Sequence, residues 1–164
     1  MSLDGDLVGY LDGLNRGIQE QVLRSAAHAG AKFLQDVAQA NAPVYVPKGL
    51  TKRRIKPGQL RDSIYRVFSE SQSSGTFKLY EVSWNHTKAP HGYWMENGFW
   101  LTKGKRRSGQ QVKVRWVPGK AFIRRAGDRS DEALRIATQR ADERMHELVQ
   151  SLQTGASMKK DVDL

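Results

Sequence analysis

The sequence predicts an α+β fold in which two helices flank a small antiparallel sheet. Three observations support this prediction: a helical pattern over residues 4–41, a second one over residues 130–154, and β-branched and aromatic runs between them. Helices and strands segregated along a chain in this way are typical of helices packed on one face of a sheet. We expect a long N-terminal helix, a three- to four-stranded antiparallel sheet and a C-terminal helix on one sheet face. A single domain would cover residues 1–154, followed by a flexible tail over residues 155–164.

The N-terminal helix is predicted from apolar residues that recur at spacings of three and four between Leu7 and Ala40. This spacing places them on one stripe of an α-helix. Gly13 and Gly17 each weaken a helix interior by about 1 kcal/mol relative to alanine, so the helix is expected to bend or break there. Pro43 ends it, because the residue before a proline disfavours the α region.

The C-terminal helix is predicted to begin at Ser130, a plausible N-cap followed by two acidic residues that suit the helix dipole. Its apolar stripe runs from Leu134 to Leu152. Gly155 follows the last periodic residue and stops the helix.

Strand signals occur in four segments, namely residues 63–68, 77–84, 93–96 and 112–116. The first two flank the turn-forming residues 72–75 and therefore predict a hairpin. In the last segment, apolar and basic residues alternate, which indicates a strand with one buried face. Trp84 and Trp116 are expected in the core of the sheet.

The formal net charge of +10 is concentrated in the middle of the chain. Residues 1–41 and 128–164 each balance to -2, whereas residues 42–127 balance to +14. Two long connections, residues 44–59 and 97–111, are predicted as basic loops without an acid, and loops of this length usually have a function. Trp100, between Phe99 and Leu101, is a candidate partner anchor. The basic residues proposed for partner contact are Lys48, Lys52, Arg53, Arg54, Lys56, Lys103, Lys105, Arg106 and Arg107.

Several classes of chemistry lack their usual residues. Cysteine is absent, which excludes disulfides and thiolate sites. The histidines are not at ligand spacing and no phosphate loop is present, so we expect no metal, no cofactor and no enzyme activity. No apolar run approaches the roughly 20 residues of a membrane span, and no signal peptide is recognisable at the N-terminus. Two alternatives stay open: nucleic-acid binding by tryptophans and cations, and a metal-independent ribonuclease using His91, Glu96 and arginines.

Three motifs follow one another along the chain. The first is Ala42-Pro43-Val44 followed by Pro57-Gly58-Gln59-Leu60-Arg61-Asp62-Ser63-Ile64. The second is His91-Gly92-Tyr93-Trp94-Met95-Glu96-Asn97-Gly98, and the third is Pro118-Gly119-Lys120-Ala121-Phe122-Ile123-Arg124-Arg125-Ala126. In this order they resemble the siphophage tail-completion family, also described as minor tail, neck or head–tail joining proteins. The resemblance covers about residues 20–150. Its departures are a basic insert in the first motif, a one-residue offset in the second, and Ala121 and Arg125 in place of prolines in the third.

The resemblance singles out ten motif residues: Pro43, Gly58, Leu60, Arg61, Ser63, Tyr93, Glu96, Gly98, Phe122 and Arg124. We expect Gly58 and Gly98 to adopt turn conformations with positive φ. Phe122 should attach the start of the last helix to the sheet. Arg61 and Glu96 are expected to pair, within one subunit or between two.

The resemblance implies a structural virion protein at the head–tail junction of a tailed bacteriophage, present in the host cytoplasm during assembly. It implies a homo-oligomeric ring of six or twelve copies, which needs a heterologous interface that closes on itself. The implied neighbours are connector or stopper proteins and tail-tube or tail-terminator proteins. The basic loops would dock on acidic faces of these neighbours, with weak contact to genomic DNA in the lumen.

Overall fold

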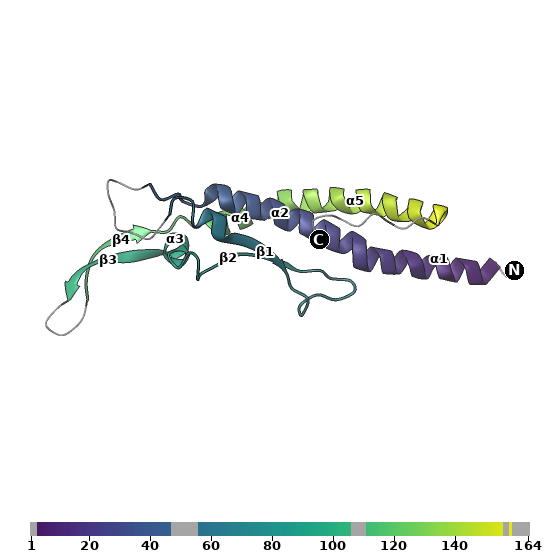
Figure 1. The fold of residues 1–164 in the computed structure, drawn as a ribbon, viewed down its shortest axis with the longest axis horizontal. Helices are drawn as coiled ribbons and strands as arrows, with labels where there is room; N and C mark the ends of the chain where they lie inside the picture. Colours follow the sequence, from purple (N-terminus) through teal and green to yellow (C-terminus); the bar gives the residue numbers. More distant parts are fainter. Residues whose placement is uncertain (1–2, 47–55, 106–110, 156–157, 159–164) are drawn as a thin grey trace. The chain divides into compact units, whose positions relative to one another are not determined.

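The computed structural model describes residues 3–46, 56–105, 111–155 and 158, and it is α+β (Figure 1). The elements follow in the order α1 (Leu3–Gly17), η1 (Ile18–Val22), α2 (Leu23–Asn41), η2 (Arg61–Ser63), β1 (Ile64–Phe68), β2 (Tyr80–Trp84), α3 (Gly92–Asn97), β3 (Gly98–Lys105), β4 (Gln111–Pro118), α4 (Phe122–Gly127) and α5 (Ser130–Thr154).

The chain divides into two compact units. The helical unit comprises Met1–Phe33, Arg66–Glu81 and Ser130–Leu164, and the ribbon unit comprises Leu34–Tyr65 and Val82–Arg129. The predicted flexible tail falls largely on residues 156–157 and 159–164, which lie outside the described residues.

The long N-terminal helix is confirmed, and α2 ends at Asn41, as expected from Pro43. The glycines do not interrupt it. Instead, a π-helical segment, η1, follows Gly17, whose own backbone remains right-handed α. The predicted apolar stripe is buried around Val22 but exposed near the N-terminus, at Leu7 and Leu11.

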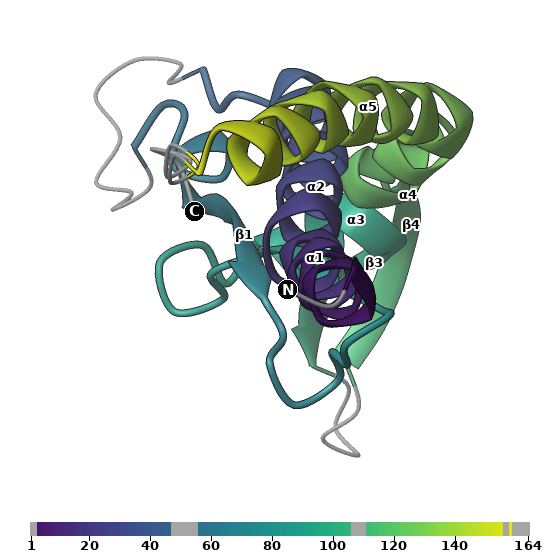
Figure 2. The same ribbon diagram turned by 90° about the vertical axis from the view of Figure 1, so that its right-hand side faces the viewer.

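Helix α5 lies beside the N-terminal helix in both ribbon views (Figures 1 and 2). A Cβ atom added to Gly17 would lie 2.8 Å from Leu148 Cδ2, and one added to Gly13 would lie 3.3 Å from Leu152 Cδ2. The two glycines therefore let the leucines of α5 approach the helix backbone closely. The sequence predicts that the C-terminal helix covers a sheet face, but these contacts attach it to a helix.

Polar contacts also join the helices of this unit. Arg140 Nε donates a 3.1 Å hydrogen bond to the Ser25 hydroxyl of α2. Arg144 is buried on α5 and pairs with Glu147 one turn later. The first contact links α5 to α2, and the second lies within α5, where it gives the buried Arg144 guanidinium a partner of opposite charge.

The prediction of one three- to four-stranded sheet is wrong. In the described part of the chain, β1 pairs with β2 and β3 pairs with β4, as two separate two-stranded antiparallel sheets. The first pair is the predicted hairpin, although its second strand begins at Tyr80 rather than Phe77. The separation arises because residues 93–96, expected as a strand, form the helix α3 between them.

Helix α3 forms where Gly92 lies against an aromatic ring. A Cβ atom at Gly92 would lie 2.6 Å from Trp84 Cδ1, so only glycine allows the helix to start this close to β2. The Met95 amide then donates a 3.0 Å hydrogen bond to the His91 carbonyl oxygen, which closes the helical turn. This tertiary contact overrides the strand preference of the aromatic residues.

The β1–β2 hairpin packs on side chains from the helices. In the helical unit, Tyr80 contacts Phe68 and His28 with ring centroids 5.1 and 5.5 Å apart. In the ribbon unit, the Gln35 side-chain amide donates a 3.0 Å hydrogen bond to the Ile64 carbonyl oxygen. Phe122, fully buried, meets the Trp84 ring edge-on at 5.8 Å, as expected for a residue that attaches a helix to the sheet. It does so from the separate short helix α4.

Candidate interaction surface

The β3–β4 ribbon is the most exposed strand pair of the described residues, and most of β3 lies in the segment predicted as the second basic loop. Its register places Trp100 opposite Trp116 and Leu101 opposite Arg115. The run Phe99-Trp100-Leu101-Thr102 has the composition of a strand, and the lysines after it obscured this signal. The loop prediction for residues 97–111 is therefore wrong for most of its length.

Large apolar side chains of this ribbon face solvent. Trp100 is 47% exposed and Trp116 is 45% exposed, so the expectation that Trp116 lies in a sheet core is wrong. Leu101 and Val114 are also exposed. A strand buries its alternate residues only where another element packs on that face. A two-stranded ribbon with no element packed on it leaves the side chains of both faces exposed to solvent.

The two tryptophans form the centre of one face. Their ring centroids lie 5.6 Å apart in an edge-on arrangement. The Lys113 ammonium lies 5.4 Å from the Trp100 centroid, within the range of a cation–π interaction. Lys103 and Arg115 are exposed elsewhere on the same ribbon. The ribbon therefore combines aromatic area with positive charge and, from Gly98 to Pro118, holds no acidic residue.

An irregularity places more side chains in solvent. Leu101 pairs with Arg115 and Thr102 pairs with Lys113, which leaves Val114 as an extra residue on β4. An extra residue on one strand is a β-bulge, which bends the strand and increases its twist. A bulge also discourages regular pairing of another strand along this edge, so we expect partners to use the side chains of the ribbon.

The base of the ribbon is fixed by close backbone packing at a glycine. Gly98 begins β3 with φ 86°, a left-handed conformation that favours glycine, as predicted. A Cβ atom there would lie 2.7 Å from both Trp116 Cζ2 and the Val117 carbonyl oxygen. The first pair of the ribbon can therefore close only without a side chain at this position.

A buried carboxylate joins the base of the ribbon to α4. Glu96, with a side chain only 8% exposed, accepts hydrogen bonds from the Ile123 amide at 3.0 Å and the Arg124 amide at 3.1 Å. Arg124 Nε adds an ion pair at 3.1 Å. Arg124 Nη2 also donates to the Glu96 carbonyl oxygen at 2.9 Å. These contacts satisfy free backbone donors at the start of a helix.

The expected Arg61–Glu96 pair is not formed within the chain. Arg61 pairs with its neighbour Asp62 at 3.0 Å, and both side chains are more than half exposed. Glu96 pairs with Arg124 instead, so the second and third sequence motifs meet each other in the ribbon unit. Tyr93, which the resemblance singles out in the second motif together with Glu96 and Gly98, is exposed.

The first motif forms the turn that leads into β1. Gly58 has φ 76°, as predicted, and Leu60 is buried. The Ser63 hydroxyl donates a 2.7 Å hydrogen bond to the Leu60 carbonyl oxygen, so it is engaged in the turn. Pro43, the earlier residue of this motif, follows the end of α2. The motif residues therefore have structural roles at junctions between elements.

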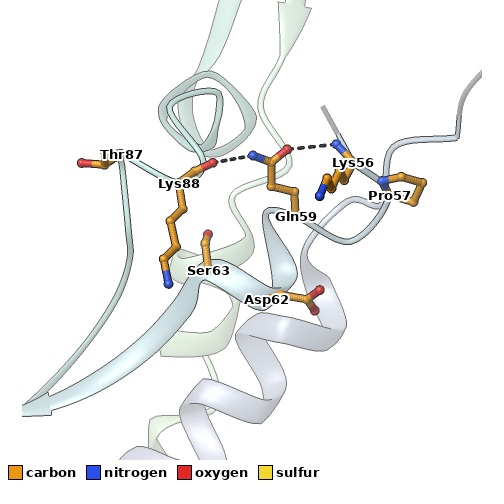
Figure 3. A pocket seen from close by; sticks show the side chains of 7 residues that line it. All are labelled: Lys56, Pro57, Gln59, Asp62, Ser63, Thr87 and Lys88. Atoms are coloured by element: carbon orange, nitrogen blue, oxygen red, sulfur yellow. Dashed lines mark hydrogen bonds between the residues drawn. The ribbon is translucent and has the colours of Figure 1, made fainter. Parts of the chain in front are cut away.

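Beside this turn lies an open pocket of about 570 Å³, lined by Lys56, Pro57, Gln59, Asp62, Ser63, Thr87 and Lys88 (Figure 3). The Gln59 side chain bridges its two edges: its oxygen accepts from the Lys56 amide at 3.0 Å, and its nitrogen donates to the Lys88 carbonyl oxygen at 2.6 Å. The lining carries two lysines and one carboxylate, a mildly cationic surface. Its only hydroxyl other than that of Ser63 is on Thr87, which points away from Gln59 in Figure 3.

The ribonuclease alternative placed His91 and Glu96 in one catalytic pair. Burial lowers the pKa of His91 from its ordinary value of 6.5, which favours a neutral imidazole at neutral pH. However, both carboxylate oxygens of Glu96 are occupied by α4, and its side chain is buried. Among the described residues, no group of three or more acidic or histidine side chains is arranged to hold a metal ion.

Several of the predicted partner residues lie in parts of the chain that the structure does not describe. Lys48, Lys52, Arg53, Arg54, Arg106 and Arg107 lie outside the described residues, and Lys105 is described in its backbone alone. Lys56 lines the pocket, whereas Trp100 and Lys103 lie on the ribbon.

In the described part of the chain, no helix has both the length and the apolar character needed to cross a membrane. Comparisons with protein-family models, with curated proteins and with solved structures found no match to this chain.

Proposed function

We propose that this protein is a non-catalytic assembly subunit that binds other protein chains through the β3–β4 ribbon. The observation that carries the proposal is the exposure of four large apolar side chains on one ribbon: Trp100, Leu101, Val114 and Trp116. Aromatic residues and arginine are enriched where proteins bind each other, and apolar side chains gathered on one element indicate such a surface. Exposed cations around the tryptophans add long-range attraction and orientation.

The particular assembly we propose is a ring at the head–tail junction of a tailed bacteriophage, in which this chain is the repeated subunit. This step rests on the three sequence motifs that resemble the tail-completion family. The contacts of Glu96 with Ile123 and Arg124 support it, because residues from two motifs build one joint. A ring of six or twelve copies would match the symmetry of its neighbours, the connector or stopper and the tail tube or terminator.

The test is to measure the mass of the purified protein over a range of concentrations and to image the product by electron microscopy. We expect closed rings of uniform copy number. Extracts of cells infected with a phage that encodes the chain should also contain it in complete particles. A protein that stays monomeric at all concentrations and is absent from particles would refute the proposal.

Nucleic-acid binding is the second candidate, favoured by the Lys113–Trp100 stack and the adjacent Arg115. Bases stack on exposed aromatic rings, and cations bind the phosphates. A filter-binding titration at several salt concentrations tests it. Binding that weakens steeply with salt and is lost in Trp100→Ala would support this function, whereas absence of binding at low salt would remove it.

The ribonuclease alternative has less support, because the Glu96 carboxylate is used to hold α4. Labelled RNA incubated with the purified wild-type, Glu96→Gln and His91→Ala proteins distinguishes enzyme from contaminant. Loss of cleavage in both variants, each still folded, would establish the enzyme, whereas equal cleavage by all three proteins would indicate a contaminant.

A further inference from the structure

A second exposed apolar surface lies on the first turns of α1. Leu7 is 58% exposed and Leu11 is 52% exposed, and Val8 and Tyr10 beside them are also exposed. Leu7 and Leu11 are four residues apart, so they are neighbours on the helix surface, and each has a further neighbour three residues away, Tyr10 for Leu7 and Val8 for Leu11. The close contacts of α1 with α5 occur at Gly13 and Gly17, in the C-terminal half of α1. The surface formed by Leu7, Val8, Tyr10 and Leu11, which we call the α1 patch, is left uncovered within the helical unit.

The α1 patch and the β3–β4 ribbon have opposite charge. Helix α1 carries three aspartates and one arginine, a net charge of -2. The described side chains of the ribbon include three cations, Lys103, Lys113 and Arg115, and no acid. Apolar side chains of opposite-charge surfaces can pack while the charges around them attract and set the orientation.

The two elements also match in length. Helix α1 has 15 residues and is about 22 Å long at 1.5 Å per residue. Each ribbon strand has eight residues and is about 26 Å long at 3.3 Å per residue. A helix laid along the ribbon would therefore cover the tryptophan pair and extend over most of the strand length.

We infer that the α1 patch of one copy docks on the β3–β4 ribbon of a second copy. A contact between two different patches is heterologous, so a complex of two copies keeps one free α1 patch at one end and one free ribbon at the other. Repetition of such a contact closes a ring when the rotation allows it. The inference rests on the proposed function and names the interface that would build its ring.

The experiment uses two variants of the full chain, Leu11→Asp on the α1 patch and Trp116→Ser on the ribbon. Both residues are exposed, so circular dichroism should show unchanged folding. Each variant alone should lose higher oligomers, with self-association weakened about tenfold or more, as for other central interface residues. Leu134→Asp is the matched control, because Leu134 is an exposed leucine on α5 that belongs to neither surface, and its oligomers should be unchanged.

Mixing the two variants gives the sharpest result. The Trp116→Ser chain keeps its α1 patch and the Leu11→Asp chain keeps its ribbon, so one intact interface remains between them. Native mass spectrometry should then detect a heterodimer that does not grow further. The absence of cysteine allows a second measurement, in which Leu11→Cys in one chain and Trp116→Cys in another should form a disulfide between copies.

The outcomes separate the two proposals. Oligomers that persist in both variants would overturn this interface but leave standing the proposal that the chain forms a ring at the head–tail junction. Mixed variants that remain monomeric, or cysteine variants that form no disulfide between the Leu11→Cys and Trp116→Cys chains, would also overturn it. A wild-type protein that is monomeric at all concentrations and absent from particles would overturn both.

Discussion

The two strand pairs of this protein have the same antiparallel pairing but opposite surroundings. The β1–β2 hairpin is covered by helix side chains, with Tyr80 packed on His28 and Trp84 on Phe122. The β3–β4 ribbon has longer strands, yet Trp100 and Trp116, which meet each other edge-on, remain about half exposed. Aromatic residues in strands thus stabilise the fold in one pair and are available to partners in the other. Substitutions should therefore separate into those that unfold the protein and those that affect binding alone.

The largest effect is expected for Phe122→Ala, beneath β2. Phe122 is fully buried against Trp84, so its removal leaves a cavity in the ribbon unit. We expect a loss of about 3–5 kcal/mol in the free energy of unfolding. Urea denaturation followed by tryptophan fluorescence measures it. A loss below 1 kcal/mol would show that this hairpin is no better covered than the ribbon.

The next effect concerns the joint at the base of the ribbon. Glu96→Gln replaces one accepting oxygen with a donor, although both the Ile123 and Arg124 amides need an acceptor. We expect a loss of about 1–3 kcal/mol in unfolding free energy. Arg124→Gln is the control: Arg124 is 65% exposed, so its ion pair contributes less than about 1 kcal/mol. Equal losses in the two variants would show that the ion pair, rather than the backbone contacts, holds the joint.

Trp100→Ala on the ribbon should change stability less. Its edge-on contact with Trp116 and its cation–π contact with Lys113 are both partly exposed, so we expect a loss of about 1 kcal/mol or less. Denaturation measured beside Phe122→Ala provides the comparison. A loss as large as that of Phe122→Ala would mean that the ribbon face is covered in solution.

The helices could be predicted from the sequence because their signals are local. Periodic apolar residues, Pro43 and Gly155 define their extent without knowledge of the rest of the chain. The sheet could not be predicted as well, because strand pairing depends on contacts between distant residues. The close approach of Gly92 to Trp84, which accompanies α3, has no signature in residues 92–97 themselves.

Only the part of the candidate surface with a local sequence signal could be predicted, because exposure depends on contacts with distant residues. Trp100 and Lys103 were identified because an apolar triplet and basic residues follow one another in a short segment. Trp116 was assigned to a core because alternation in β4 indicates a buried face, but it does not show whether any element covers that face. The exposed α1 patch was also missed, since a helical stripe gives no indication of where its cover by α5 ends.

The smallest effect should come from pH at the base of the ribbon. Burial lowers the pKa of His91 below 6.5, so the unfolded chain takes up a proton at a pH where the folded chain does not. Stability from this residue is therefore constant above pH 6.5 and falls as the pH decreases below it. His91→Gln removes this contribution, so the difference in unfolding free energy between the two proteins should change between pH 7.5 and pH 5.5, with the wild-type protein losing stability relative to the variant at the lower pH. A difference that does not vary with pH would place His91 in water, as exposed as the ribbon side chains.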